Sequence, residues 1–155
     1  MTREETIRHL NELLRVCVDG EAGYRTAAEH VQNSELASVF TEYANQRGHC
    51  ARQLHAEIER QGGTAEDSGT LQAAIHRGWM DLKSTVTGGD PGAIIAACET
   101  GEDAAQAAFE GVVDTDISGA ARSLVETQRH KIQEALARLL RLKAEASAGI
   151  EYPKN

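Results

Sequence analysis

Apolar residues recur in alternating steps of three and four along four long stretches of the chain, which is the spacing of one helix face. This pattern predicts long helices from about Arg3 to Gln32, from a break at Asn33-Ser34 to about Gln61, from Pro91 to about Val113, and from a turn at 114–118 to about Ala148. A shorter helix is expected over Leu71–Val86. The pattern therefore predicts an all-α protein.

The expected helix ends carry the residues that stop and start helices. Thr2 is a suitable N-cap, with Glu5 three residues later as its partner in a capping box. The pair Gly62-Gly63 ends the second helix, because glycine is favoured just past a helix terminus. Asp90 and Pro91 form an N-cap followed by proline at the first helical position.

The apolar faces of consecutive helices match when the chain is folded back at its breaks. The first two faces contain Ile7, Leu10, Leu14, Cys17, Glu21, Tyr24, Ala28 and Val31, and then Leu36, Phe40, Tyr43, Arg47, Cys50, Leu54 and Ile58. The next two contain Pro91, Ile95, Cys98, Glu102, Ala105, Phe109 and Val112, and then Ser118, Ala121, Val125, Gln128, Ile132, Ala135 and Leu139. This register predicts two antiparallel hairpins with one polar residue per helix, so that Glu21 faces Arg47 and Glu102 faces Gln128.

The connection between the two hairpins is too long for a simple up–down–up–down bundle, which needs a link on the order of 2–8 residues. Residues 62–90 separate the hairpins, and a helix over Leu71–Val86 would rise about 24 Å. The sequence therefore predicts a four-helix bundle with a long crossover between its second and third long helices, containing an extra helix. In that topology the four polar residues lie at one height, roughly 15–18 Å below one end of the bundle.

Size and charge limit the possible functions further. A chain of 155 residues predicts a single domain over 1–148, followed by a flexible tail at 149–155. The net charge of −8 disfavours nucleic acids and anionic membranes, because no basic stripe is present. No signal peptide and no apolar run near 18 residues is found, so a cytoplasmic protein is expected. The cysteines, Cys17, Cys50 and Cys98, lie one per helix without zinc spacing, which suits a reducing compartment.

A crossover bundle with inward carboxylates at its middle resembles the ferritin-like superfamily, over residues 3–148. More narrowly, four stretches resemble a bacterial ferritin-like family catalogued as a domain of unknown function: Val18–Tyr24 (VDGEAGY), Gln46-Arg47, His76–Lys83 (HRGWMDLK) and Glu99–Asp103 (ETGED). The resemblance implies a fold and no particular activity. Di-iron members of the superfamily use a glutamate on each of two helices and a Glu-x-x-His pair on each of the other two.

The ligands of such a di-iron site are only partly present in this chain. Glu21 and Glu102 match the single glutamates, but the two pairs read Arg47-x-x-Cys50 and Gln128-x-x-Lys131. Arginine keeps its proton and offers only hydrogen-bond donors, so it repels a metal cation. A slightly rotated helix pair would offer another ligand set for iron or manganese: Glu21, His49, Glu99, Glu102, Glu126 and His130.

The simpler interpretation is a buried polar layer without metal. Arg47 is expected to fork between Glu21 and Glu102, with Gln128 completing the hydrogen bonds. This favours a non-enzymatic structural, binding or stress-associated bundle that needs no cofactor, with an unidentified protein partner or a second copy of the chain as its partner. The alternative is an iron or manganese protein with oxidase or metal-storage chemistry.

Three other features add hypotheses about function. Cys17 and Cys50 are expected to face each other one layer below the polar residues, and they would form a redox pair if within disulfide range. Tyr24 lies one layer above and is expected to fill the core and hydrogen-bond inward. Trp79, in the crossover, either packs on the bundle or forms part of a partner surface, and the sequence leaves both open.

Overall fold

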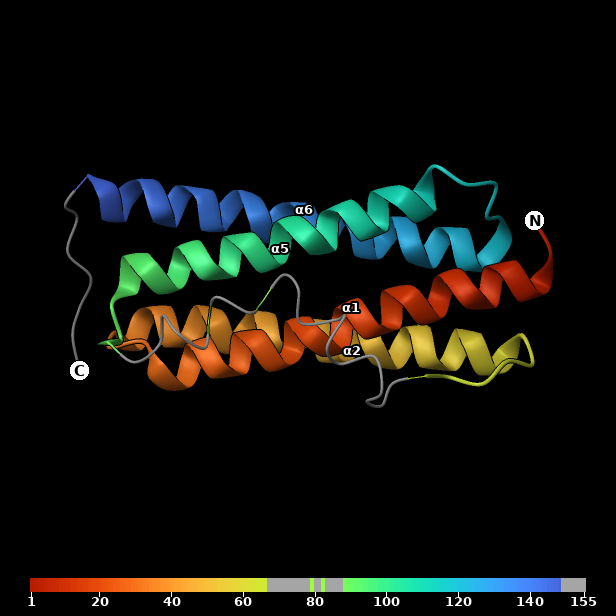
Figure 1. Ribbon diagram of the computed structural model, residues 1–155, viewed down its shortest axis with the longest axis horizontal. Helices are drawn as coiled ribbons and strands as arrows, with labels where there is room; N and C mark the ends of the chain where they lie inside the picture. Colours follow the sequence, from red (N-terminus) through yellow and green to blue (C-terminus); the bar gives the residue numbers. More distant parts are fainter. Residues whose placement is uncertain (67–78, 80–81, 83–87, 149–155) are drawn as a thin grey trace.

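The computed structural model describes residues 1–66, 79, 82 and 88–148. Within these residues the chain forms four α-helices and no strand: α1 (Arg3–His30), α2 (Ser34–Arg60), α5 (Pro91–Val113) and α6 (Gly119–Ser147) (Figure 1). The prediction of an all-α four-helix bundle is confirmed. The helix expected over Leu71–Val86 lies outside the described residues except for Trp79 and Leu82, and so does the expected tail at 149–155.

Local sequence signals set the helix ends. Thr2 and Glu5 form the predicted capping box at the start of α1. α1 ends two residues earlier than predicted, because Val31 is already extended and Asn33 serves as the N-cap of α2. The side-chain oxygen of Asn33 accepts a hydrogen bond of 2.9 Å from the backbone N–H of Leu36. Asn33, in the short connection, therefore provides a hydrogen-bond acceptor for a free backbone N–H in the first turn of α2.

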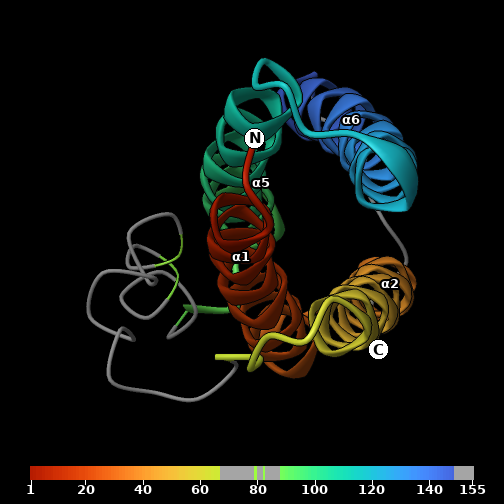
Figure 2. The same cartoon turned by 90° about the vertical axis from the view of Figure 1, so that its right-hand side faces the viewer.

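The four helices stand at the corners of a rectangle when viewed along the bundle (Figure 2). α1 packs against α2 and α5, and α6 closes the rectangle between α5 and α2. Neighbouring helices run antiparallel, whereas α2 and α5, at opposite corners, run in the same direction (Figure 1). α2 ends at the opposite end of the bundle from the start of α5, so the connection between these two helices must span the length of the bundle. The predicted crossover topology therefore agrees with the arrangement of the described helices.

The interior contains two apolar clusters, one towards each end of the bundle. The first includes Tyr24, Phe40, Tyr43, Trp79, Ile94, Ile95, Cys98 and Leu139. The second includes Leu10, Leu14, Cys17, Cys50, Leu54, Phe109, Val125 and Ile132. The buried polar side chains Arg47, Glu102 and Gln128 belong to neither cluster. The core is thus an apolar filling with a polar layer across its middle.

Trp79 fixes one point of the crossover to the bundle. Its side chain is buried and fits between Gly23 of α1 and Gly101 of α5, where a Cβ on either glycine would overlap the indole. The indole meets the ring of Tyr24 edge-on, with the ring centroids 5.0 Å apart. The two glycines make room for the largest side chain of the protein, so Trp79 packs on the bundle rather than facing solvent.

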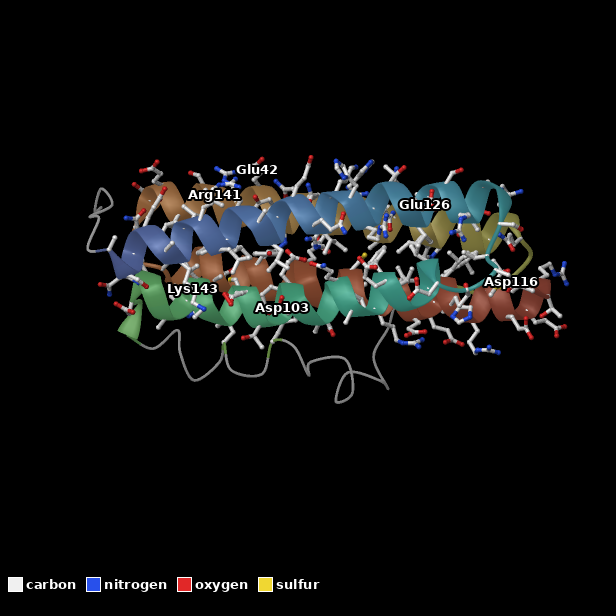
Figure 3. All side chains as sticks on the ribbon, turned by 90° about the horizontal axis from the view of Figure 1, so that it is seen from above. Glu42, Asp103, Asp116, Glu126, Arg141 and Lys143 are labelled. Carbon is white, nitrogen blue, oxygen red and sulfur yellow. The ribbon has the colours of Figure 1, made fainter. Side chains whose placement is uncertain are left out.

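Charged side chains project from the outer faces of the helices (Figure 3). Some pair across helices: Lys143 of α6 with Glu99 of α5 at 2.9 Å, and Arg138 of α6 with Glu42 of α2 at 3.4 Å. The more exposed pair, Arg138 with Glu42, is of a kind that stabilises a fold by less than about 1 kcal/mol. None of the helices in the described part of the chain is long and apolar enough to cross a membrane.

Candidate functional site: a buried ion pair

An ion pair between Arg47 of α2 and Glu102 of α5 lies at the centre of the bundle. Both side chains are almost completely buried, and Arg47 Nη2 lies 2.5 Å from Glu102 Oε1. The hydroxyl of Tyr24 donates a hydrogen bond to the other carboxylate oxygen, Oε2. Both oxygens of Glu102 are therefore engaged, one by a cation and one by a neutral donor.

Arg47 is held from several sides. Its Nη1 donates a hydrogen bond of 2.9 Å to Oε1 of the neighbouring Gln46. Its aliphatic stem passes close to Gly20 of α1, where an added Cβ would lie 3.1 Å from Cγ and 3.2 Å from Cδ. The guanidinium carbon stands 5.9 Å from the centre of the Tyr24 ring. The long side chain of Arg47 thus crosses from α2 to α5 over Gly20, which has no side chain and leaves room for it.

The surroundings of the ion pair keep Arg47 charged and Tyr24 neutral. Burial is the largest single effect and disfavours the charge of Arg47, but Glu102, Tyr24 and Cys17 together outweigh burial and raise the pKa of the guanidinium. Burial, followed by the negative charge of Glu102, raises the pKa of Tyr24 well above its usual value. The tyrosine therefore keeps its proton and remains a donor to the carboxylate.

Gln128 of α6 is fully buried at the same level, but its hydrogen bonds go elsewhere. Its Nε2 donates to the backbone oxygen of Cys50 at 3.1 Å and to Oε1 of Gln53 at 3.2 Å. Within the described part of the chain, Oε1 of Gln128 and Nε of Arg47 have no hydrogen-bond partner. Gln128 therefore ties α6 to α2 and does not complete the ion pair as the sequence suggested.

Glu21 does not join the layer, and here the sequence-based expectation is corrected. Its side chain is 31% exposed and pairs with Arg25, one turn along α1, at 3.0 Å. At this height the buried face of α1 is formed by Gly20 and Gly23, which lie beside Arg47 and Trp79. This rotation of α1 turns Glu21 towards a groove on the α1–α2 side. Among the residues that the structure describes, Arg47 thus has one carboxylate partner instead of two.

The remaining candidate metal ligands are distributed over the surface. Glu99 pairs with Lys143 at 2.9 Å, Glu126 with Arg122 at 3.0 Å, and His130 with Glu134 at 3.0 Å, while His49 is exposed. Among the described residues, no three or more His, Cys, Asp or Glu side chains come together as a metal would require. With a guanidinium bound to the central carboxylate, the di-metal centre implied by the ferritin-like resemblance does not fit these residues.

Cys17 of α1 and Cys50 of α2 belong to the same buried apolar cluster. Both are fully buried, and both are free thiols. The neighbouring Cys50 and burial raise the pKa of Cys17, whereas the neighbouring Cys17 and the charge of Arg47 lower the pKa of Cys50.

Sequence reasoning missed several members of the site. It placed Tyr24 in the core as an inward hydrogen-bond donor, but not on Glu102. The contacts of Gln46 and Gln53 were not anticipated, because both lie beside the apolar face rather than in it. Gly20 could have indicated the site in the sequence, since a glycine in the middle of a helix often marks the close approach of another group.

Comparison with known proteins places the chain in a family. Residues 5–115 match the model of a family described as Domain of unknown function (DUF2383). The match includes Tyr24, Arg47 and Glu102, whereas Gln128 lies beyond it. A search of curated proteins found no match. Because the matched residues form well over half of its length, this protein belongs to the family described as Domain of unknown function (DUF2383).

Proposed function

We propose that this protein is a ferritin-like bundle of the cytoplasm that acts as a non-enzymatic structural or binding protein, with the Arg47–Glu102 ion pair in place of a metal centre. The main support for the proposal is that both oxygens of the Glu102 carboxylate already have hydrogen-bond partners. One oxygen lies 2.5 Å from Arg47 and the other accepts from Tyr24. A metal ion would have to displace a buried cation to bind there, which is electrostatically unfavourable.

The ion pair supplies what a central metal supplies in a bundle, namely a fixed contact between helices of different hairpins. Arg47 belongs to the first hairpin and Glu102 to the second. Because removing one partner would leave a buried charge without compensation, the pair strongly favours this register over slipped alternatives. This role needs no reaction at the site, and any interaction with a partner then takes place on the outer surface.

Metal analysis of untagged protein tests the proposal. The protein is loaded anaerobically with Fe(II) or Mn(II), freed of excess metal, and compared with a chelator-treated sample of the same preparation. We expect no retained metal and no change in Tm between the two samples, because a ligand that does not bind the folded state cannot stabilise it. Retention of about two metal ions per chain, together with a higher Tm, would overturn the proposal in favour of a metalloprotein.

A further inference from the structure

A groove between α1 and α2 has no part in the central ion pair. It encloses about 460 Å³, which lies within the range of about 300–1,000 Å³ that small-molecule sites occupy. Its apolar lining comes from Leu14 and Val18 of α1 and from Ala51 and Ala56 of α2. Leu14 and Ala51 are also buried members of the apolar core. The apolar part of the groove is therefore continuous with the packed interior of the bundle.

Gly48 of α2 allows two charged side chains of the groove to lie close to the helix backbone. A Cβ at this position would overlap Oε2 of Glu21 and would lie 3.4 Å from Nη1 of Arg52. Glu21 and Arg52 also line the groove, one from each helix. The groove thus combines an apolar lining with a small number of polar groups, which is the usual composition of a site for a small ligand.

The charged groups of the groove differ in whether they already have a partner. Glu21 pairs with Arg25 at 3.0 Å, and Oε1 of Glu59 lies 2.7 Å from Nδ1 of His55. The guanidinium of Arg52 is exposed and makes no ion pair or hydrogen bond with any residue that the structure describes. Both acidic side chains in the lining are therefore matched by a neighbouring base, whereas the charge of Arg52 remains for a ligand. A planar guanidinium binds a carboxylate through two parallel hydrogen bonds.

We propose that this groove binds a small apolar carboxylate, with its hydrocarbon part against the apolar lining and its carboxylate on Arg52. Removing the hydrocarbon from water favours binding, and the guanidinium selects a carboxylate over other polar groups. The net charge of −8 would by itself attract a cation and repel an anion, so a preference for the carboxylate requires this local contact. The groove shares no residue with the central ion pair, so the proposal does not depend on whether that layer binds a metal.

The test titrates the full-length protein with phenylbutyrate and follows the backbone amides by NMR. Phenylbutanol and phenylbutylamine serve as matched probes, because they have the same hydrocarbon part with a neutral or a cationic group. We expect saturable shifts at residues 14–21 and 48–59, which line the groove, with a Kd on the order of 1 mM for a ligand of this size. The alcohol and the amine should bind at least about tenfold more weakly. No saturable shifts in these residues, or equal binding of the three probes, would overturn the proposal.

Three variants test the two halves of the site. Arg52→Gln should weaken the binding of phenylbutyrate by at least about tenfold and remove its advantage over phenylbutanol. Arg141→Gln removes an exposed cation of α6 outside the groove and should leave binding unchanged. Ala56→Trp places a large side chain in the groove from an exposed position and should abolish binding. Unchanged binding in Arg52→Gln or Ala56→Trp, or equal losses in the two arginine variants, would overturn the proposal. The comparison of the three probes on the parent protein decides the question by itself if a variant fails to fold.

Discussion

Replacing Arg47 with Met tests whether the central ion pair holds the bundle together. Methionine keeps most of the apolar stem that passes over Gly20 and removes the charge beside the buried carboxylate of Glu102. Breaking a buried pair from one side costs about 3–5 kcal/mol. Tyr24 would remain as a hydrogen-bond donor to Glu102, but it carries no charge that could replace the guanidinium.

We therefore expect Arg47→Met to lower the free energy of unfolding by about 3–5 kcal/mol, because the buried carboxylate of Glu102 loses its cation. Urea unfolding of parent and variant measures this difference. The double variant Arg47→Met with Glu102→Gln should recover most of the loss, because no buried charge remains. Arg25→Met provides a surface control, since Arg25 pairs with the partly exposed Glu21 and should contribute about 0.3–0.5 kcal/mol. A loss below about 1 kcal/mol, the range of an exposed pair, would refute the reasoning.

Two further predictions concern the surroundings of the pair. Gly101→Ala should push Trp79 out of its site and shift the fluorescence of this single tryptophan to the red, because the new Cβ would overlap the indole. Gly111→Ala, on the same helix but next to open space, should leave the emission unchanged and raise Tm slightly, and an identical spectrum in both variants would contradict the packing. Tyr24→Phe should lower the free energy of unfolding by about 1.5–3 kcal/mol, measured with urea, since it removes a donor to the charged Glu102; an unchanged midpoint would argue against that hydrogen bond.

Local interactions made much of the fold predictable. The capping box at Thr2 and the proline start at Pro91 act within one helical turn, so the sequence reveals them directly. The spacing of apolar residues also placed Arg47 and Glu102 in the core at the same height, and the buried ion pair between them is confirmed. A long side chain with a fixed charge among apolar neighbours needs a group of opposite charge and has few candidates for it, which is why that contact was predictable.

The rotation of each helix about its axis was decided only by the tertiary structure. A strict three-and-four spacing drifts by about 20° per heptad relative to a straight helix, so the sequence could not decide which of Gly20 and Glu21 faced the core. Packing settled it: Arg47 lies over Gly20 and Trp79 fills the gap between Gly23 and Gly101, which turned Glu21 outward to Arg25. The sequence by itself determined the four helices, their pairing and the buried charge. The partners of that charge depended on the close approach of side chains far apart in the sequence, which no local pattern encodes.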